Sequence, residues 1–100
     1  MNAQIKRIQE MEKLLNECWK VLDDYDKALD DFKSIQKKIE KLETYYTSKR
    51  WMKDYEDYEA GKIPRDLPCG VLSEDAVYDL LTENRDMILE MLDLAKERIR

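Results

Sequence analysis

Hydrophobic residues recur every seven positions along a stretch of 44 residues, Ala3 to Tyr46, that contains no glycine and no proline. Three rows of this repeat are apolar: Ile8, Leu15, Leu22 and Leu29; Met11, Cys18, Tyr25, Phe32, Ile39 and Tyr46; and Leu14, Val21, Ala28, Ile35 and Leu42. The spacing predicts one helix over residues 3–46, which would be about 66 Å long. Gln36 and Glu43 continue the first row, so the apolar stripe narrows, or the helix bends, in its second half.

The width of the stripe bears on association. Three apolar positions in every seven suit a helix that faces more than one neighbour, whereas a simple coiled-coil dimer needs a seam of only two. A second copy of the chain could cover the excess, which predicts a homodimer that closes a helical bundle. The alternative is a break in the helix at residues 23–26, Asp-Asp-Tyr-Asp, which would give a compact monomeric bundle.

A second, shorter helix is predicted over residues 49–60. Thr47 and Ser48 precede it, and both are residue types that cap helix N-termini. Gly61 follows it, at the position where glycine commonly ends a helix. The polar pair and the glycine therefore bound the helix on both sides.

A loop and a third helix complete the chain. Both prolines and both glycines fall within ten residues, so a loop is predicted over residues 61–72, held against the helices by its apolar side chains. Ser73 is expected to cap a helix over residues 74–98. Together these elements predict a single all-α domain over residues 1–100. In it, the long N-terminal helix packs antiparallel against the two shorter helices.

Composition narrows the possible functions. The chain is 43% hydrophobic and 41% charged, as long helices with solvated outer faces would be, and its net charge of −5 does not favour nucleic-acid binding by the whole molecule. It contains no histidine, which removes imidazole bases and histidine-ligated metals. Two cysteines are too few for a disulfide scaffold, and no signal peptide or membrane-spanning run is evident. A cytoplasmic protein is expected.

Several local motifs occur in an order that is typical of one protein family. They are Arg7-Ile8, Tyr45-Tyr46, Trp51, Asp54-Tyr55-Glu56, Gly61-Lys-Ile-Pro, Leu67 and Gly70-Val-Leu-Ser-Glu-Asp-Ala-Val-Tyr-Asp-Leu-Leu. In these motifs the chain resembles the bacterial family known as domain of unknown function 4298, over nearly its whole length. The resemblance implies a small, all-helical, cytoplasmic bacterial protein and implies no activity. Cys69 departs from the family pattern, in which a charged residue is expected.

Carboxylates gather in two places. One set, in the long helix, is Asp23, Asp24, Asp26, Asp30 and Asp31; the other, around the loop, is Asp54, Glu56, Asp57, Glu59, Asp66, Glu74 and Asp75. The first is spread around the helix without the turn glycine of a calcium loop, and a solvated helix face explains it. The second could surround a small acidic cleft, although helix exposure and capping explain most of it. We expect no cofactor, no metal and no catalytic residue, and hence not an enzyme.

A basic run with aromatic neighbours offers another function. It comprises Lys33, Lys37, Lys38, Lys41, Lys49, Arg50 and Lys53, with Tyr45, Tyr46 and Trp51 among them. Positive charge interleaved with aromatic rings is typical of proteins that bind single-stranded nucleic acid. Acidic blocks on either side, and the position of the rings on the apolar stripe, argue against it. Nucleic-acid binding through Lys33 to Lys53 is therefore the alternative hypothesis.

The main hypothesis is a non-enzymatic protein–protein interaction or homodimerisation module. Tyrosine and tryptophan are enriched where proteins meet. The candidate interaction surface comprises Trp51, Asp54, Tyr55, Tyr58, Asp66 and Tyr78. The competing interpretation is that these aromatic residues pack the loop onto the helices, with their hydroxyls at the rim.

Overall fold

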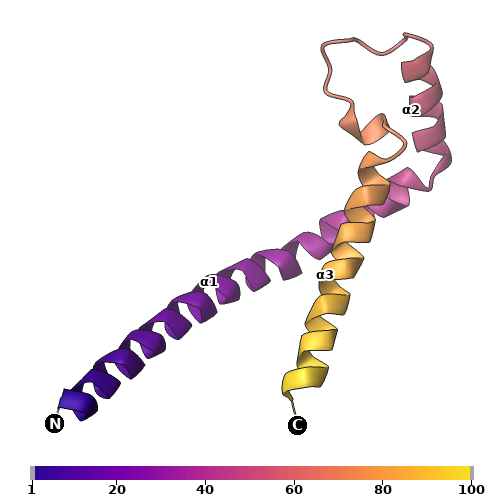
Figure 1. Cartoon of the computed structure of the whole chain (residues 1–100). Coiled ribbons are helices and arrows are strands. Elements are labelled where there is room, and N and C mark those ends of the chain that lie inside the picture. Colours follow the sequence, from indigo (N-terminus) through magenta and orange to yellow (C-terminus); the bar gives the residue numbers. More distant parts are fainter. Residues whose placement is uncertain (1, 100) are drawn as a thin grey trace. The chain divides into compact units, whose positions relative to one another are not determined.

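The structure, a computed structural model, describes residues 2–99 (Figure 1). Its helices are α1 (Asn2–Tyr46), α2 (Lys49–Glu59) and α3 (Ala76–Arg98), and a short 3-10 helix, η1 (Gly70–Leu72), precedes α3. No strand occurs within this described part of the chain. The predicted all-α class, with a long N-terminal helix that packs against shorter ones, is confirmed.

Helix α1 is continuous from Asn2 to Tyr46, so the hypothesis of a break at residues 23–26 is wrong. Its start lies one residue before the predicted position 3. The lack of glycine and proline explains the continuity, because neither backbone freedom nor a missing donor interrupts the hydrogen-bond ladder. Within the acidic segment, Lys20 forms an ion pair with Asp24 one turn later, at 3.0 Å.

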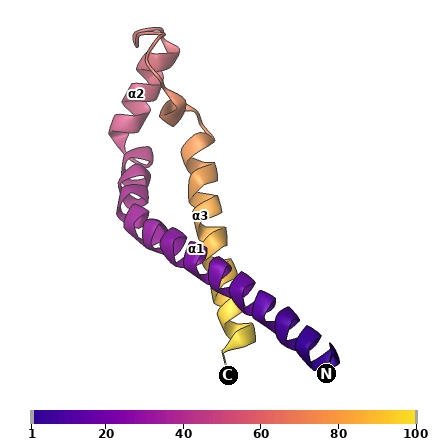
Figure 2. The ribbon, with the colours of Figure 1, turned by 90° about the vertical axis from the view of Figure 1, so that its left-hand side faces the viewer.

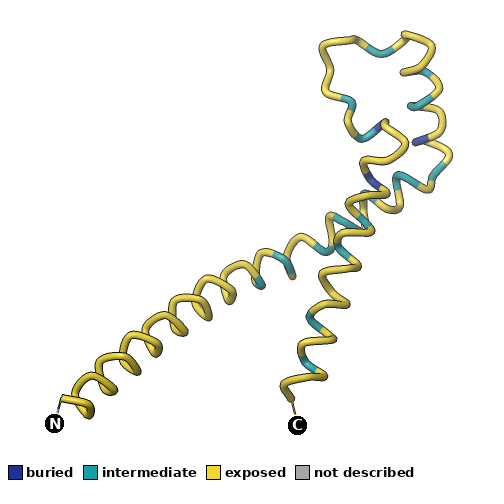
Figure 3. The backbone as a smooth tube through the Cα atoms, viewed as in Figure 1, coloured by how far each residue is buried: buried dark blue, intermediate teal, exposed yellow. Residues whose placement is uncertain are grey.

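The chain divides into two compact units, and the boundary lies inside α1, between Gln36 and Lys37. The first unit, taken by itself, is a single helical segment. None of its described residues, 2–36, is buried. Figure 3 shows exposed residues along most of this segment; residues 2–28 are all exposed, and Leu29, Phe32 and Gln36 are half-buried. A lone helix has no second element against which to bury an apolar face.

The second unit begins with the end of α1 and the turn into α2. Ser48 has extended backbone angles, and its hydroxyl accepts a hydrogen bond from the Trp51 amide, with 3.2 Å between the heavy atoms. The Ser48 amide donates in turn to the Tyr45 carbonyl at 3.0 Å. Of the two candidate capping residues, Ser48 is therefore the N-cap of α2.

Gly61 ends α2 with a positive φ of 75°, a backbone conformation that residues with a Cβ atom rarely adopt. The Gly61 amide donates to the Tyr58 carbonyl at 3.1 Å, and the Lys62 amide donates to the Asp57 carbonyl at 2.9 Å. This pair of bonds is a Schellman motif, which satisfies the last carbonyls of the helix. Ala60 becomes the C-cap, so the helix ends at Glu59 and not at the predicted position 60.

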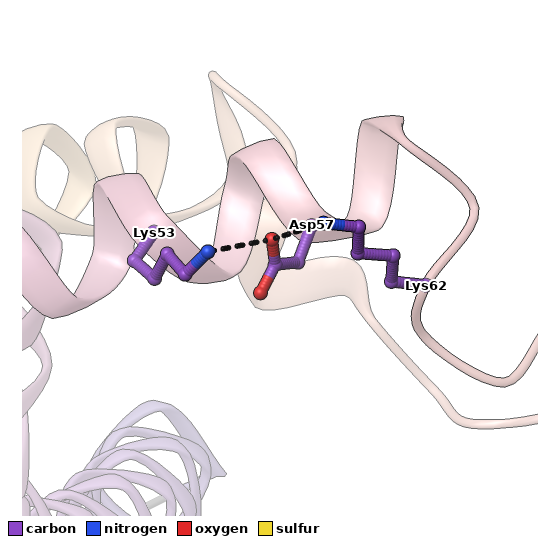
Figure 4. A network of polar contacts seen from close by, with 3 residues as sticks. All are labelled: Lys53, Asp57 and Lys62. Carbon is purple, nitrogen blue, oxygen red and sulfur yellow. Dashed lines mark hydrogen bonds and ion pairs between the residues drawn. The ribbon is translucent and has the colours of Figure 1, made fainter.

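The Asp57 side chain reinforces the same turn (Figure 4). Its Oδ1 lies 3.1 Å from the Lys53 ammonium within α2 and 4.0 Å from the Lys62 ammonium just beyond the helix. The carboxylate thus bridges the last turns of the helix and the first residue after Gly61. Its two lysine partners are largely exposed, so solvent screens both pairs and each stabilises the turn only weakly.

A small core holds the loop and the start of α3. Its buried side chains are Trp51 from α2, Leu72 from η1 and Val77 from α3. Figures 1 and 2 both show the segment that leads into α3 beside α2. The predicted loop over residues 61–72 therefore contains a helical turn, Gly70–Leu72, that places Leu72 in the core.

Helix α3 begins at Ala76, two residues later than the predicted start at 74. Glu74 and Asp75 form a turn, and the Ser73 hydroxyl accepts from the Ala76 amide at 3.0 Å. Ser73 thus bonds across the turn that precedes the regular helix, and Asp75 occupies the N-cap position without a side-chain bond. Within the described helices, no apolar segment is long enough to cross a membrane.

Candidate functional site

Two aromatic rings, from Tyr46 and Tyr55, pack against Trp51. Tyr46 meets its indole edge-on, with ring centroids 5.1 Å apart and planes at 72°, and Tyr55 stacks on it at 5.2 Å and 12°. The indole Nε1 donates to the Val71 carbonyl at 2.9 Å. Since only 8% of Trp51 is exposed, its ring holds the loop against α2 and is not an exposed interface anchor. The interpretation that aromatic residues pack the loop is thus correct for this residue.

Tyr45 and Asp54 connect the end of α1 to α2. The phenol of Tyr45 donates to Asp54 Oδ2 at 2.6 Å. Burial of the phenol, followed by this hydrogen bond and the repulsion that the carboxylate would exert on a phenolate, raises the pKa of Tyr45 to about 12. Asp54, placed in the interaction surface by sequence reasoning, therefore serves within the fold.

Two further tyrosines converge on Glu74. Tyr46 donates to the Glu74 backbone carbonyl at 2.8 Å, and the Tyr55 phenol donates to the Glu74 carboxylate at 3.2 Å. The hydrogen bond to the Glu74 carboxylate raises the pKa of Tyr55, and the negative charge of Glu59 raises it further. Both bonds fix the turn before α3 to the aromatic cluster.

A shallow, open cleft of about 560 Å³ lies beside this cluster. It is lined by Tyr55, Tyr58, Glu59, Cys69, Gly70, Leu72, Ser73, Glu74 and Asp75. The structure thus brings together three of the carboxylates expected around an acidic cleft, Glu59, Glu74 and Asp75. Among the residues that the structure describes, no group of three carboxylate or cysteine side chains is arranged to hold a metal ion.

The rest of the predicted interaction surface is dispersed. Tyr58 borders the cleft, whereas the described lining of that cleft includes neither Asp66 nor Tyr78. Tyr58, Asp66 and Tyr78 are exposed, and Tyr78, at 61%, is more exposed than Tyr58, at 42%. A role for these three side chains in partner binding stays a prediction.

Sequence reasoning placed Glu74 by the cleft but missed the hydrogen bonds that Tyr45 and Tyr46 make in this site. The Tyr45–Asp54 bond joins residues nine apart across a helix boundary, and the Tyr46–Glu74 bond joins residues 28 apart. Neither pair lies within one uninterrupted helix, so a helical period does not relate its members. The one available signal was the density of tyrosine next to Trp51.

The same contacts bear on nucleic-acid binding. Tyr45 and Tyr46 are half-buried and Trp51 is buried, and all three rings make contacts within the fold. The lysines of the basic run are exposed, and Lys53 among them pairs with Asp57. Nucleic-acid binding through Lys33 to Lys53 stays a prediction, and its aromatic residues have structural roles that its lysines lack.

The first unit presents a different kind of candidate surface. Large residues of its apolar stripe are exposed at Ile8, Met11, Leu14, Leu15, Val21, Leu22, Tyr25 and Ile35, and the neighbouring Ile5 and Trp19 are exposed as well. Leu29 and Phe32, towards the end of the stripe, are half-buried. Val21 is 65% exposed and Trp19 58%. The opposite face repeats lysine every seven residues, at Lys6, Lys13, Lys20 and Lys27. The segment is therefore a strongly amphipathic helix, with an apolar face and an opposite face that carries lysines.

Comparison with known proteins gives a family match. The family model described as "Domain of unknown function (DUF4298)" matches residues 8–94, which covers most of the chain and confirms the resemblance drawn from the motifs. No curated protein and no solved structure matches the chain.

Proposed function

This chain belongs to the DUF4298 family, and we propose that it is a non-enzymatic interaction module that forms a homodimer in the bacterial cytoplasm. The observation that supports the proposal is the apolar face of residues 2–36, where no described residue is buried. Large contiguous apolar surfaces on proteins in water mark sites of association. The two cysteines and the bacterial family resemblance support the compartment.

The dimensions of this face suit a partner helix. The 35 described residues of the first unit span about 52 Å of helix. A stable protein interface of standard size buries about 800 Å² on each partner. A row of large aliphatic and aromatic side chains along such a length can supply that area, and each buried Å² of apolar surface contributes about 25 cal/mol.

The side-chain chemistry supports a role in association and not in catalysis. The chain has no histidine, and the pKa values of two phenols are raised, that of Tyr45 by burial and then its bond to Asp54, and that of Tyr55 by its bond to Glu74. The ordered hydrogen bonds of the second unit link its own elements, as expected of groups that stabilise a fold. Apolar packing between chains needs none of these groups.

A matched pair of lysine substitutions tests the proposal. Leu22→Lys places a charge on the apolar face, and Ser34→Lys adds one to the opposite face, in line with the existing lysine row. Light scattering after size-exclusion chromatography, at about 100 µM, should show a dimer for the wild type and for Ser34→Lys, because micromolar affinity suffices at this concentration. Leu22→Lys should give a monomer. Equal masses for both variants would contradict the proposal.

A further inference from the structure

The apolar face of residues 2–36 has two unlike edges. Its centre consists of two rows, Ile8, Leu15, Leu22 and Leu29, and Met11, Cys18, Tyr25 and Phe32. Between residues 12 and 35 one edge is apolar: Leu14, Val21, Ala28 and Ile35. The other edge over the same span is mostly polar: Glu12, Trp19, Asp26 and Lys33. One heptad earlier the contrast is absent, since the first edge continues to Arg7 and the second to Ile5. In a straight helix a seven-residue row drifts by about 20° per heptad, and the supercoil of two paired helices removes this drift, so pairing keeps the two edges apart over residues 12–35.

This asymmetry favours one orientation of a second copy. In a parallel pair, each apolar edge would face the polar edge of its partner, and Val21 would lie beside Asp26 and Ala28 beside Lys33 of the other copy. In an antiparallel pair, the two apolar edges meet each other and so do the two polar edges. Only the antiparallel arrangement therefore buries the apolar edge against another apolar edge instead of against charged side chains.

Charge on the polar edge then selects the register. When Leu22 lies level with Tyr25 of the other copy, Glu12 faces Lys33 of that copy, and Trp19 faces its Asp26. By symmetry each contact occurs twice. A slip of one heptad in one direction brings Glu12 to Asp26, and a slip in the other brings Asp26 to its own counterpart. Both slips set like charges together, which opposes association.

We propose that residues 2–36 form an antiparallel dimer with the same segment of a second copy, in the register that places Leu22 level with Tyr25. This inference rests on the proposed homodimer and specifies its geometry. The central layers pair Leu15 with Phe32 and Cys18 with Leu29. The apolar edges pair Leu14 with Ile35 and Val21 with Ala28. The outer lysine row stays in solvent, where Lys20 already has Asp24 as its ion partner.

The native cysteine in the centre of the face reports the arrangement. Cys18 is exposed and carries a free thiol. In the antiparallel register it lies opposite position 29 of the other copy and about 16 Å along the axis from the other Cys18. In a parallel dimer the two Cys18 residues would face each other. A disulfide needs Cα atoms no more than about 7 Å apart, so oxidation distinguishes the two arrangements.

Cross-linking of the full chain tests the orientation. Every protein carries Cys69→Ser, so that Cys18 is its single native thiol. The test variant adds Leu29→Cys, and the control adds Lys27→Cys on the opposite face. Mild oxidation followed by peptide mass mapping should give a covalent dimer joined between positions 18 and 29 in the test variant. The yield should be at least about fivefold lower in the control and in the parent, because their thiols lie farther apart than a disulfide spans.

A charge swap tests the register independently. Glu12→Lys and Lys33→Glu should each raise the dissociation constant of the dimer roughly 3- to 10-fold, because each places two like-charged pairs in the interface. The double variant should return to within about twofold of the wild type, since it restores both attractive pairs. Sedimentation at low ionic strength measures all four proteins. Failure of the double variant to recover would overturn the register.

The outcomes separate this inference from the proposal beneath it. A covalent dimer joined through Cys18 on both sides would show a parallel pair, and would overturn the inference while the homodimer stands. If light scattering shows a dimer but no disulfide joins position 18 to position 29, the antiparallel arrangement is likewise overturned while the homodimer stands. A chain that stays at 12.1 kDa, with no cross-link, would remove the homodimer itself.

Discussion

The two units of this chain use hydrophobic residues in different ways. From Lys37 onward, residues of α2, η1 and α3 enclose Trp51, Leu72 and Val77, and a network of tyrosine hydrogen bonds surrounds them. Up to Gln36, a single helical segment carries a longer apolar face on which no described residue is buried and only Leu29 and Phe32 are half-buried. The second unit can therefore be stable through its own contacts. The first needs another surface, since isolated helices are marginal in water.

The largest effect is expected at the tryptophan of the second unit. Trp51→Ala removes the ring stack and the bond to the Val71 carbonyl, and should lower the free energy of unfolding by about 3–5 kcal/mol. Urea unfolding followed by far-ultraviolet circular dichroism measures it. Trp19→Ala is the matched control, because Trp19 is 58% exposed at the edge of the apolar face. An equal loss in the two variants would contradict the distinction between the units.

Two leucine substitutions, one in each unit, should differ in how their effect on stability depends on protein concentration. Leu72→Ala empties a buried site and should cost about 2–4 kcal/mol at every protein concentration, because its neighbours lie in the same chain. Leu15→Ala alters the face that we assign to a second copy, so its effect on the melting temperature should depend on concentration. Thermal melts at two concentrations a hundredfold apart give both results. A concentration-independent effect of Leu15→Ala would locate its partner within the chain.

Tyr45 makes the second unit sensitive to alkaline pH. Its pKa is raised from 10.0 to about 12 in the folded state, so folding favours the protonated phenol. That contribution is complete below pH 10 and is lost as the pH rises towards 12. The urea midpoint should fall across this window in the wild type and fall less in Tyr45→Phe. At pH 7 the substitution should cost about 1–2 kcal/mol for the lost hydrogen bond.

The smallest effect is expected on the outer face of the first unit. Lys20→Ala breaks the ion pair with Asp24, whose side chains are 77% and 64% exposed, and should change stability by less than about 0.5 kcal/mol. Dimer mass should stay as in the wild type. A loss of association in this variant would place the interface on the lysine side and contradict the assignment of faces.

The sequence predicted the structure best where a single residue type determines the local backbone conformation. A stretch free of glycine and proline predicted α1, and the structure has it continuous. Ser48 and Gly61 predicted the limits of α2 because a hydroxyl cap and a positive φ are local requirements. These features depend on neighbours within about four residues, which a sequence displays directly.

Contacts between distant residues were harder to predict. The link from Trp51 to the Val71 carbonyl spans 20 residues, and the two tyrosine bonds to Glu74 depend on the path of the loop between them. Helix α3 begins at Ala76 and not at the predicted position 74, because residues 73–75 form a separate turn. The capping pattern alone does not distinguish such a turn from the first turn of a helix. Trp51 and Asp54 therefore looked like surface residues although they hold the fold together.

The central claim is that a second copy covers the apolar face of residues 2–36. Sedimentation equilibrium of the unmodified chain, over concentrations from about 1 to 100 µM, tests it most directly. The account predicts that the average mass rises with concentration towards twice 12.1 kDa. A mass that stays at 12.1 kDa across the whole range would contradict it.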